Sequence, residues 1–187
     1  MGAVDLVAHR PEWAAEFVQL ARVLQDALHG VARRIDHIGS TSVPGLSAKD
    51  VIDMQVIVAR LVPLDERLPA GFEARFGGAI VRDHVPAGWK GPVDAWDKRL
   101  YARLEGRIAH LHVRISGSPS ERYALLFRDY LRADEDARDR WATVKARVAA
   151  ESESRDAYAG AKDPLTDDLM TDAERWAHAS GWSVPAA

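Results

Sequence analysis

The sequence contains no cysteine, and this absence excludes several kinds of chemistry. Without thiols the chain can form no disulfide, no thiolate nucleophile and no zinc site built on sulfur. A chain without disulfides fits the reducing cytoplasm, where disulfides are rare. We therefore expect a cytoplasmic protein.

Long apolar runs are absent as well. No stretch approaches the roughly 20 apolar residues that a membrane-spanning helix needs. Near the N-terminus, Asp5, His9 and Arg10 interrupt the apolar residues. The sequence therefore predicts neither a signal peptide nor a membrane partner.

A large positive charge is the third absence. The 187 residues carry a net charge of −3, which disfavours nucleic acid as the main partner. Hydrophobic residues make up 47% and charged residues 28%, as in ordinary globular proteins. This length fits one domain over residues 1–187, with a sheet core and N-terminal helix in 1–117 and a helical portion in 118–187. The sequence does not fix the oligomeric state.

Two familiar motifs are also missing. There is no Walker pattern, and Gly39-Ser40 is followed by Thr-Ser-Val instead of completing the Gly-x-Ser-x-Gly turn of serine hydrolases. P-loop nucleotide hydrolysis and serine hydrolysis are therefore disfavoured.

The hydrophobic pattern that is present predicts an α+β fold. Apolar residues recur every three or four positions from Trp13 to Leu28, which predicts a helix that Pro11 begins and Gly30 ends. Residues 51–59 are the most apolar stretch of the chain and lack clean alternation, which predicts a central strand covered on both faces. A Ser-Pro-Ser-Glu sequence at 118–121 predicts the capped start of a helical C-terminal third. Further strands at 31–38, 98–104 and 108–115, the last two as a hairpin, complete a mixed sheet flanked by helices.

Residues 77–96 are irregular and rich in glycine and proline. A loop of this length in a compact domain is usually functional or disordered. Its chemically interesting residues are Asp83, His84, Trp89, Lys90 and Trp96.

The most informative stretch is the turn Gly39, Ser40, Thr41 and Ser42, which lies between two predicted strands. Backbone amides and hydroxyls concentrated in such a turn suit a phosphate or another anion. Asp53, near the start of the next strand, suits a divalent metal that would share that phosphate. The alternative is a tight strand connection with a purely local role.

His110 and His112 lie two residues apart on a predicted strand and therefore share one face. If Asp53 lies on the adjacent strand, one carboxylate and two imidazoles could hold Mn²⁺, Zn²⁺ or Fe²⁺, with Mg²⁺ less suited. The alternative is a polar strand face that meets water. His37, in the strand before the turn, is predicted to be a buried, hydrogen-bonded histidine.

Three further cations are candidates for phosphate binding. Arg99 and Arg103 share a strand face with Tyr101, and guanidinium groups there could bind phosphate bidentately. Lys49 is the third candidate. For the two arginines the alternative is a charged edge strand that discourages aggregation. For Lys49 the alternative is an ordinary surface lysine.

These residues resemble the signature of the GrpB family. The resemblance rests on His37 to Lys49, on Ile52-Asp53-Met54-Gln55-Val56 and on His110-Leu111-His112-Val113. It extends to Phe127-Arg128-Asp129-Tyr130-Leu131-Arg132 and to Tyr158 with Lys162, and so spans nearly the whole chain. The family also resembles a domain fused behind dephospho-coenzyme A kinase in some bacteria, and its fold is similar to that of nucleotidyltransferases.

The resemblance implies that Gly39-Ser40 is a phosphate turn and that Asp53 is the first metal carboxylate of a nucleotidyltransferase-like site. Two-metal transfer needs further carboxylates. This chain has Gln55 at one such position and the pair His110 and His112 at the other.

Two functions follow as expectations. One is binding of a nucleotide or phosphorylated small molecule, with nucleotidyl or phosphoryl transfer by Asp53, His110 and His112 that depends on Mg²⁺, Mn²⁺ or Zn²⁺. The other is a non-catalytic module related to coenzyme A biosynthesis, which either still binds a ligand or assists the folding of a partner such as the coenzyme A kinase. The retained turn favours the first function, and the missing carboxylates favour the second.

Overall fold

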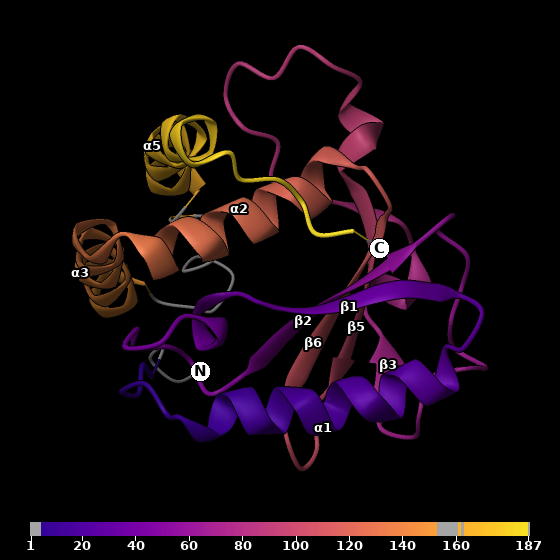
Figure 1. The fold of residues 1–187 in the computed structure, drawn as a ribbon. Helices are drawn as coiled ribbons and strands as arrows, with labels where there is room; N and C mark the ends of the chain where they lie inside the picture. Colours follow the sequence, from indigo (N-terminus) through magenta and orange to yellow (C-terminus); the bar gives the residue numbers. More distant parts are fainter. Residues whose placement is uncertain (1–4, 153–160, 162, 187) are drawn as a thin grey trace.

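The computed structural model describes residues 5–152, 161 and 163–186 (Figure 1). None of the helices described is long and apolar enough to cross a membrane. The described helices are α1 (Glu12–Ala27), α2 (Pro119–Ala133), α3 (Glu135–Glu151) and α5 (Asp163–Ser180). The strands are β1 (Ala32–Ile38), β2 (Ile52–Val58), β3 (Phe72–Ala74), β4 (Val81–Arg82), β5 (Asp97–Arg103) and β6 (Ala109–Ile115), and the short 3-10 turns are η1 (Ser40–Ser42), η2 (Phe76–Gly78) and η3 (Val93–Trp96).

The strands form one mixed sheet in the order β1-β2-β6-β5-β3, with β4 paired to β5. β2 and β6 run parallel, whereas the other neighbouring strands run antiparallel. β2 therefore lies inside the sheet, as its largely apolar sequence without clean alternation predicts. The predicted hairpin of β5 and β6 is also confirmed.

One face of the sheet carries the larger apolar core. Met54, Leu111 and Tyr101, from three neighbouring strands, pack with α1, whose Trp13 and Leu24 are fully buried. Figure 1 shows α1 running along this side of the sheet. The predicted spacing of three and four residues gives α1 the single apolar stripe that this packing requires.

The helices α2, α3 and α5 form a second layer on the opposite side of the sheet (Figure 1). Their core contains Leu126, Trp141 and Ala173, together with Val43 and Leu46 from the segment after η1. Because this segment packs into the helical layer, the turn before it is fixed between that layer and the sheet.

Ser118 caps the start of α2, as the sequence predicts, but Glu121 accepts from the residue before the cap and not from the N-cap N–H as in a standard capping box. Ser118 Oγ accepts the N–H of Glu121 at 3.2 Å, and the Glu121 carboxylate accepts the N–H of Gly117 at 2.6 Å. The α+β class, the mixed sheet flanked by helices and the helical C-terminal third are all confirmed.

Candidate functional site

The turn after β1 depends on Gly39. This residue has φ +67° and ψ −173°, a combination that is essentially restricted to glycine. A Cβ atom here would lie 2.6 Å from Oδ2 of Asp53 and 2.9 Å from its Cβ. The turn therefore rests directly on the Asp53 side chain, and the two parts of the predicted site are in contact.

Thr41 ties the turn to both flanking strands. Its hydroxyl donates to the carbonyl of Val51 at 3.2 Å and lies 3.0 Å from Nε2 of His37. Because a hydroxyl has a single hydrogen, Nε2 of His37 must be the donor in the second contact. His37 is buried and its ring stacks on Phe17 of α1, so its predicted structural role is confirmed.

The Ser42 hydroxyl is also used within the turn, where it donates to the carbonyl of Gly39. Thr41 and Ser42 are buried, whereas Gly39 is exposed and Ser40 is half-buried. The part of the predicted phosphate turn that a ligand can reach is therefore Gly39 and Ser40.

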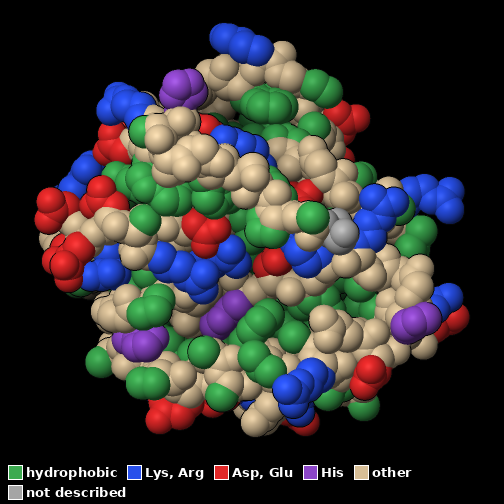
Figure 2. Space-filling view, in the orientation of Figure 1, with side chains coloured by type: hydrophobic (Ala, Val, Ile, Leu, Met, Phe, Trp, Pro, Cys, Tyr) green, Lys and Arg blue, Asp and Glu red, His purple; other side chains and the backbone are tan. Residues whose placement is uncertain are grey.

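Two arginines of α2 reach the same turn. Arg132 donates Nε and Nη2 to the carbonyl of Ser42 at 2.9 and 2.7 Å, and Arg128 donates Nη1 to the carbonyl of His37 at 3.0 Å. Figure 2 shows a band of Lys and Arg side chains between the helical layer and the sheet, with acidic side chains among them. Positive charge is thus concentrated where α2 passes the turn.

Replacing Gly39 by alanine is expected to destabilise the fold by about 2–4 kcal/mol, since backbone strain and overpacking each cost roughly 1–3 kcal/mol. Gly30→Ala is the matched control, because Gly30 has φ +75° and no described atom lies within 4 Å of a Cβ added there. Urea unfolding of both variants measures the difference. Equal losses would show that the close approach to Asp53 does not matter.

Asp53 lies beside both predicted histidines. The parallel register of β2 and β6 pairs Asp53 with His110, and Gln55 with His112. Nδ1 of His110 lies 3.2 Å from Oδ1 of Asp53, and Nε2 of His112 lies 3.9 Å from the same oxygen. Burial alone would raise the pKa of Asp53, but the two histidines hold this pKa well below its usual range.

Lys98 sets the protonation state of His112. Its ammonium group, on β5, donates a hydrogen bond to Nδ1 of His112 at 3.0 Å. Because an ammonium group cannot accept, Nδ1 carries the lone pair and Nε2 carries the proton. Burial and the positive charge of Lys98 lower the pKa of His112 to about 4. His112 is therefore a neutral imidazole that turns an N–H toward Asp53.

Asp83 binds two cations of this sheet face. Its carboxylate accepts from Lys98 and, at 2.9 Å, from Nε of Arg114. Arg114 also donates to Oε1 of Gln55 at 2.8 Å, and Gln55 donates to Asp36 at 2.9 Å. Polar side chains of four strands thus form a continuous network on the face opposite α1.

These side chains do not offer the donor set that a divalent metal needs. Within the described part of the chain, no three His, Asp or Glu side chains are placed to hold one ion. Nε2 of His112 carries a proton, and Gln55 is an amide where the resemblance implies a carboxylate. A metal at Asp53, His110 and His112 stays a prediction, and this geometry does not fit it.

The other predicted phosphate cations lie elsewhere. The register of β5 with β6 places Arg99 and Arg103 on the face that packs with α1, where Arg99 donates to the carbonyl of Leu61 at 3.3 Å. The sheet therefore separates both arginines from Asp53, which corrects the expectation that they share its ligand. Lys49 precedes β2 and is half-buried.

No role was predicted from the sequence for the cations that do reach the site. Arg128 and Arg132 belong to the resemblance, and their spacing of four places both on one face of α2. From that spacing the sequence could have predicted that the two arginines act at one place. Lys98 and Asp83 offer no local signal, since their pairing joins a strand to a loop.

Comparison with known proteins agrees with this architecture. The model of the GrpB family, described as GrpB protein, matches residues 3–172. The chain belongs to the GrpB family. A crystal structure of the conserved protein GrpB from Enterococcus faecalis is similar with a TM-score of 0.71 at 26% identity, covering 92% of this chain and 99% of that chain.

Curated relatives of this GrpB chain are of two kinds. A dephospho-CoA kinase of Mycolicibacterium paratuberculosis is 35% identical over 199 residues, covering 96% of this chain and 48% of that protein. A UPF0157 protein of Streptomyces coelicolor is 38% identical over 146 residues, covering 76% of this chain and 68% of that protein. The chain thus spans about half the length of the kinase relative. Tyr158 and Lys162, part of the resemblance, lie outside the described residues.

Proposed function

We propose that this GrpB protein binds a nucleotide or another phosphorylated small molecule at the Gly39–Ser42 turn. One observation carries the proposal: a glycine turn with an exposed backbone lies against Asp53, while Arg132 of α2 holds the carbonyl of Ser42 and Arg128 holds that of His37, just before the turn. Backbone N–H groups in such turns and guanidinium groups are both good ligands for phosphate oxygens. Gly39 and Ser40 would contact the phosphate, with Arg132 beside them.

The electrostatics at the turn support an anionic ligand. Burial, with the positive charges of Arg132 and Arg128, lowers the pKa of His37 to about 4, although the Asp53 carboxylate opposes this shift. The two guanidinium groups therefore act on the interior of the turn as well as on its surface. A phosphate at Gly39 would be attracted by the same field.

Transfer of a nucleotidyl or phosphoryl group would be a step beyond binding. The positive charges of Lys98 and Arg114 lie on the same sheet face as Asp53. Asp53 orients the imidazole of His110 through Nδ1, which leaves Nε2 of His110 as the acid–base group of such a reaction. No metal-dependent step follows from this donor set.

Calorimetric titration with ATP, AMP and inorganic pyrophosphate tests the proposal. We expect binding that weakens with salt, and binding by Arg132→Gln that is at least about tenfold weaker, because a charged hydrogen bond contributes roughly 1.5–3 kcal/mol. Arg175→Gln is the matched control, since Arg175 lies on α5, has a 74% exposed side chain and pairs with Asp172. Binding of none of the three probes, or equal effects of the two substitutions, would contradict the proposal.

The same titrations with EDTA and with Mn²⁺ address the metal. Unchanged affinity in EDTA is expected, because Arg132 and the backbone of the turn supply the phosphate contacts. Binding that requires Mn²⁺, and that is lost in His110→Ala with His112→Ala, would instead support the predicted metal site.

The kinase relatives favour a second candidate, an accessory role in coenzyme A biosynthesis. A matching region makes up about half of the Mycolicibacterium dephospho-CoA kinase. We propose for this alternative that the domain assists the folding of the kinase part. Coexpression of that kinase part with this protein, compared with the kinase part alone, would then give severalfold more soluble kinase activity. Phosphate binding without any such gain would favour the first candidate.

A further inference from the structure

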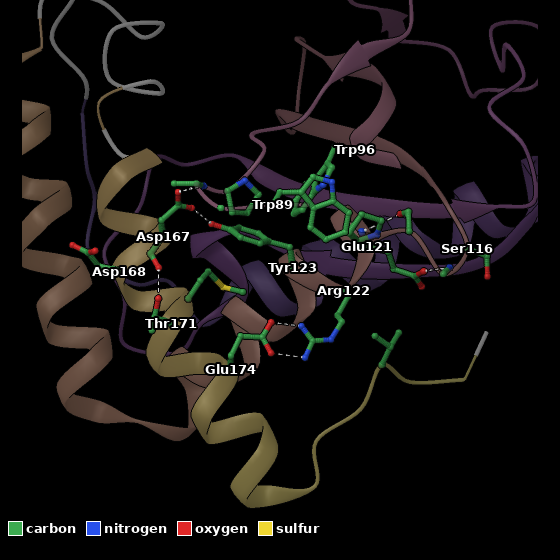
Figure 3. Close-up of a pocket in the computed structure, with 18 of the residues that line it drawn as sticks. Trp89, Trp96, Ser116, Glu121, Arg122, Tyr123, Asp167, Asp168, Thr171 and Glu174 are labelled. Carbon is green, nitrogen blue, oxygen red and sulfur yellow. Dashed lines mark hydrogen bonds and ion pairs between the residues drawn. The ribbon is translucent and has the colours of Figure 1, made fainter. Parts of the chain in front are cut away.

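A cavity of about 870 Å³ lies between the loop 83–96, the start of α2 and α5 (Figure 3). Its volume falls within the range of about 300–1,000 Å³ that is usual for small-molecule sites. Val184 and Pro185, from the segment after α5, line one side of it. The Gly39–Ser42 turn and Asp53 do not contribute to this lining.

Aromatic rings form one wall of the cavity. Trp89, Trp96 and Tyr123 follow one another in edge-to-face contacts, with 5.4 Å between the centroids of the two indoles and 5.6 Å between Trp96 and Tyr123. Trp89 is 38% exposed and Trp96 only 3% exposed. Figure 3 shows the three rings gathered on one side of the cavity. Trp89 therefore offers ring surface to a ligand, and Trp96 supports it from behind.

Contacts with α5 and α2 fix the loop that carries this wall. Asp167 of α5 accepts hydrogen bonds from Nε2 of His84 at 2.7 Å, from the N–H of Ala87 at 3.0 Å and from the hydroxyl of Tyr123 at 3.2 Å. The irregular loop is thus anchored by a carboxylate on a helix. Its aromatic wall is in place before any ligand arrives, which lowers the entropic cost of binding.

The backbone of the loop fixes the indole side chain of Trp89. Its indole N–H donates to the carbonyl of Pro92 at 3.2 Å. A Cβ added to Gly91 would lie 2.5 Å from Cζ2 of the same indole. Glycine at position 91 therefore lets the ring approach the chain closely, and this fixes the orientation that Trp89 presents.

Charge at the cavity disfavours an anion. Arg34 pairs with Glu121 at 2.6 Å, and Arg122 pairs with both carboxylate oxygens of Glu174. No further Lys or Arg side chain occurs among the described lining residues. The lining contains two guanidinium groups, Arg34 and Arg122, against four carboxylates, Glu121, Asp167, Asp168 and Glu174.

The cavity is also separate from the phosphate turn. Arg122 lines the cavity, and Arg132 reaches the turn from the other end of the same helix. Ten residues of α-helix at 1.5 Å per residue separate them by about 15 Å. An inference about the cavity therefore does not depend on the proposed function of the turn.

We propose that this cavity is a binding site for a small molecule with a flat aromatic ring and no negative charge. Stacking on Trp89 and Tyr123 supplies the affinity, because offset and edge-to-face aromatic contacts are favourable beyond their area. The surplus of carboxylates supplies the selection against phosphates and other anions.

NMR of the six tryptophan indole N–H groups tests this proposal. The probes are benzimidazole, quinoline, adenosine, AMP and the non-aromatic cyclohexanol. We expect the uncharged aromatic probes to shift the Trp89 and Trp96 signals saturably at millimolar concentration, while the signals of Trp13 and Trp141 stay unchanged. AMP is expected to bind at this site at least tenfold more weakly than adenosine, and cyclohexanol is expected not to bind.

Single substitutions show which residues bind the aromatic probes. Trp89→Ala should abolish saturable binding and Trp89→Phe should retain it, whereas Val93→Ala, on the same loop but outside the lining, should change nothing. Ser40→Ala at the phosphate turn should also leave this binding intact. Three outcomes would each overturn the proposal: no aromatic probe shifts Trp89 or Trp96, AMP binds as well as adenosine, or cyclohexanol binds as well as the aromatic probes.

Discussion

Asp83→Ala is expected to lower the free energy of unfolding by about 3–5 kcal/mol, the usual cost of removing one partner from a buried ion pair. Asp83 binds both Lys98 and Arg114, whose side chains are only 11% and 7% exposed. Without the carboxylate, the two buried cations Lys98 and Arg114 would lose the hydrogen-bond acceptor that they share. Urea unfolding monitored by circular dichroism measures this loss.

Two further substitutions make the result interpretable. Asp97→Ala, next to the same network, should cost less than about 1 kcal/mol, because Asp97 pairs with the 46% exposed Arg82. Lys98→Met should cost less than Asp83→Ala, since Arg114 would still neutralise the carboxylate. Equal losses for Asp83→Ala and Asp97→Ala would show that the network contributes little to stability.

The parts of the site that lie within one stretch of sequence could be predicted. Alternation along β6 placed His110 and His112 on one face, and the apolar run of β2 identified a central strand that carries Asp53. The glycine-rich turn was evident from composition alone. The contact between Gly39 and Asp53 was not, because it depends on the path of the chain through the turn.

Which face a strand presents could not be predicted for β5. A pattern of period two shows that Arg99 and Arg103 point the same way, but a shift of register by one residue exchanges the two faces. The observed hairpin pairs Lys98 with Arg114. Lys98, and not Arg99, is therefore the cation beside His112.

The network and the cavity depend on pairings between distant parts of the chain. Asp83 and Arg114 are 31 residues apart, His84 and Asp167 are 83 apart, and Arg34 and Glu121 are 87 apart. The first pairing is set by where the loop after β4 lies on the sheet, and the other two by how the helical layer packs against the loop and the sheet. Local propensity and hydrophobic period contain no information about such contacts, so a single sequence shows only that the loop 77–96 is irregular.

The fold is expected to lose stability steeply as the pH falls from about 6.5 to 4. His37 and His112 have a pKa of about 4 in the folded protein, against about 6.5 for an unperturbed histidine. Between these two pH values the unfolded chain binds more protons than the folded protein. Each histidine therefore lowers the free energy of unfolding by up to about 1.4 kcal/mol for every unit by which the pH falls. The full stabilisation that the two neutral histidines give is present above pH 6.5. Below pH 4, protonation of Asp53 and Asp83, whose pKa values are depressed, adds a further loss.

Urea unfolding at pH 7, 6 and 5 measures this slope, and single substitutions assign it. His37→Gln and His112→Gln should each flatten it by up to about 1.4 kcal/mol per pH unit, because glutamine can donate a hydrogen bond but cannot titrate. His29→Gln, at an exposed position after α1, is the control for replacing a histidine by glutamine. Lys98→Met should raise the pKa of His112 and flatten the slope through that residue alone. A slope unchanged in His112→Gln would mean that the pKa of His112 is the same in the folded and the unfolded protein, and the fold would then not hold this imidazole neutral beside Asp53.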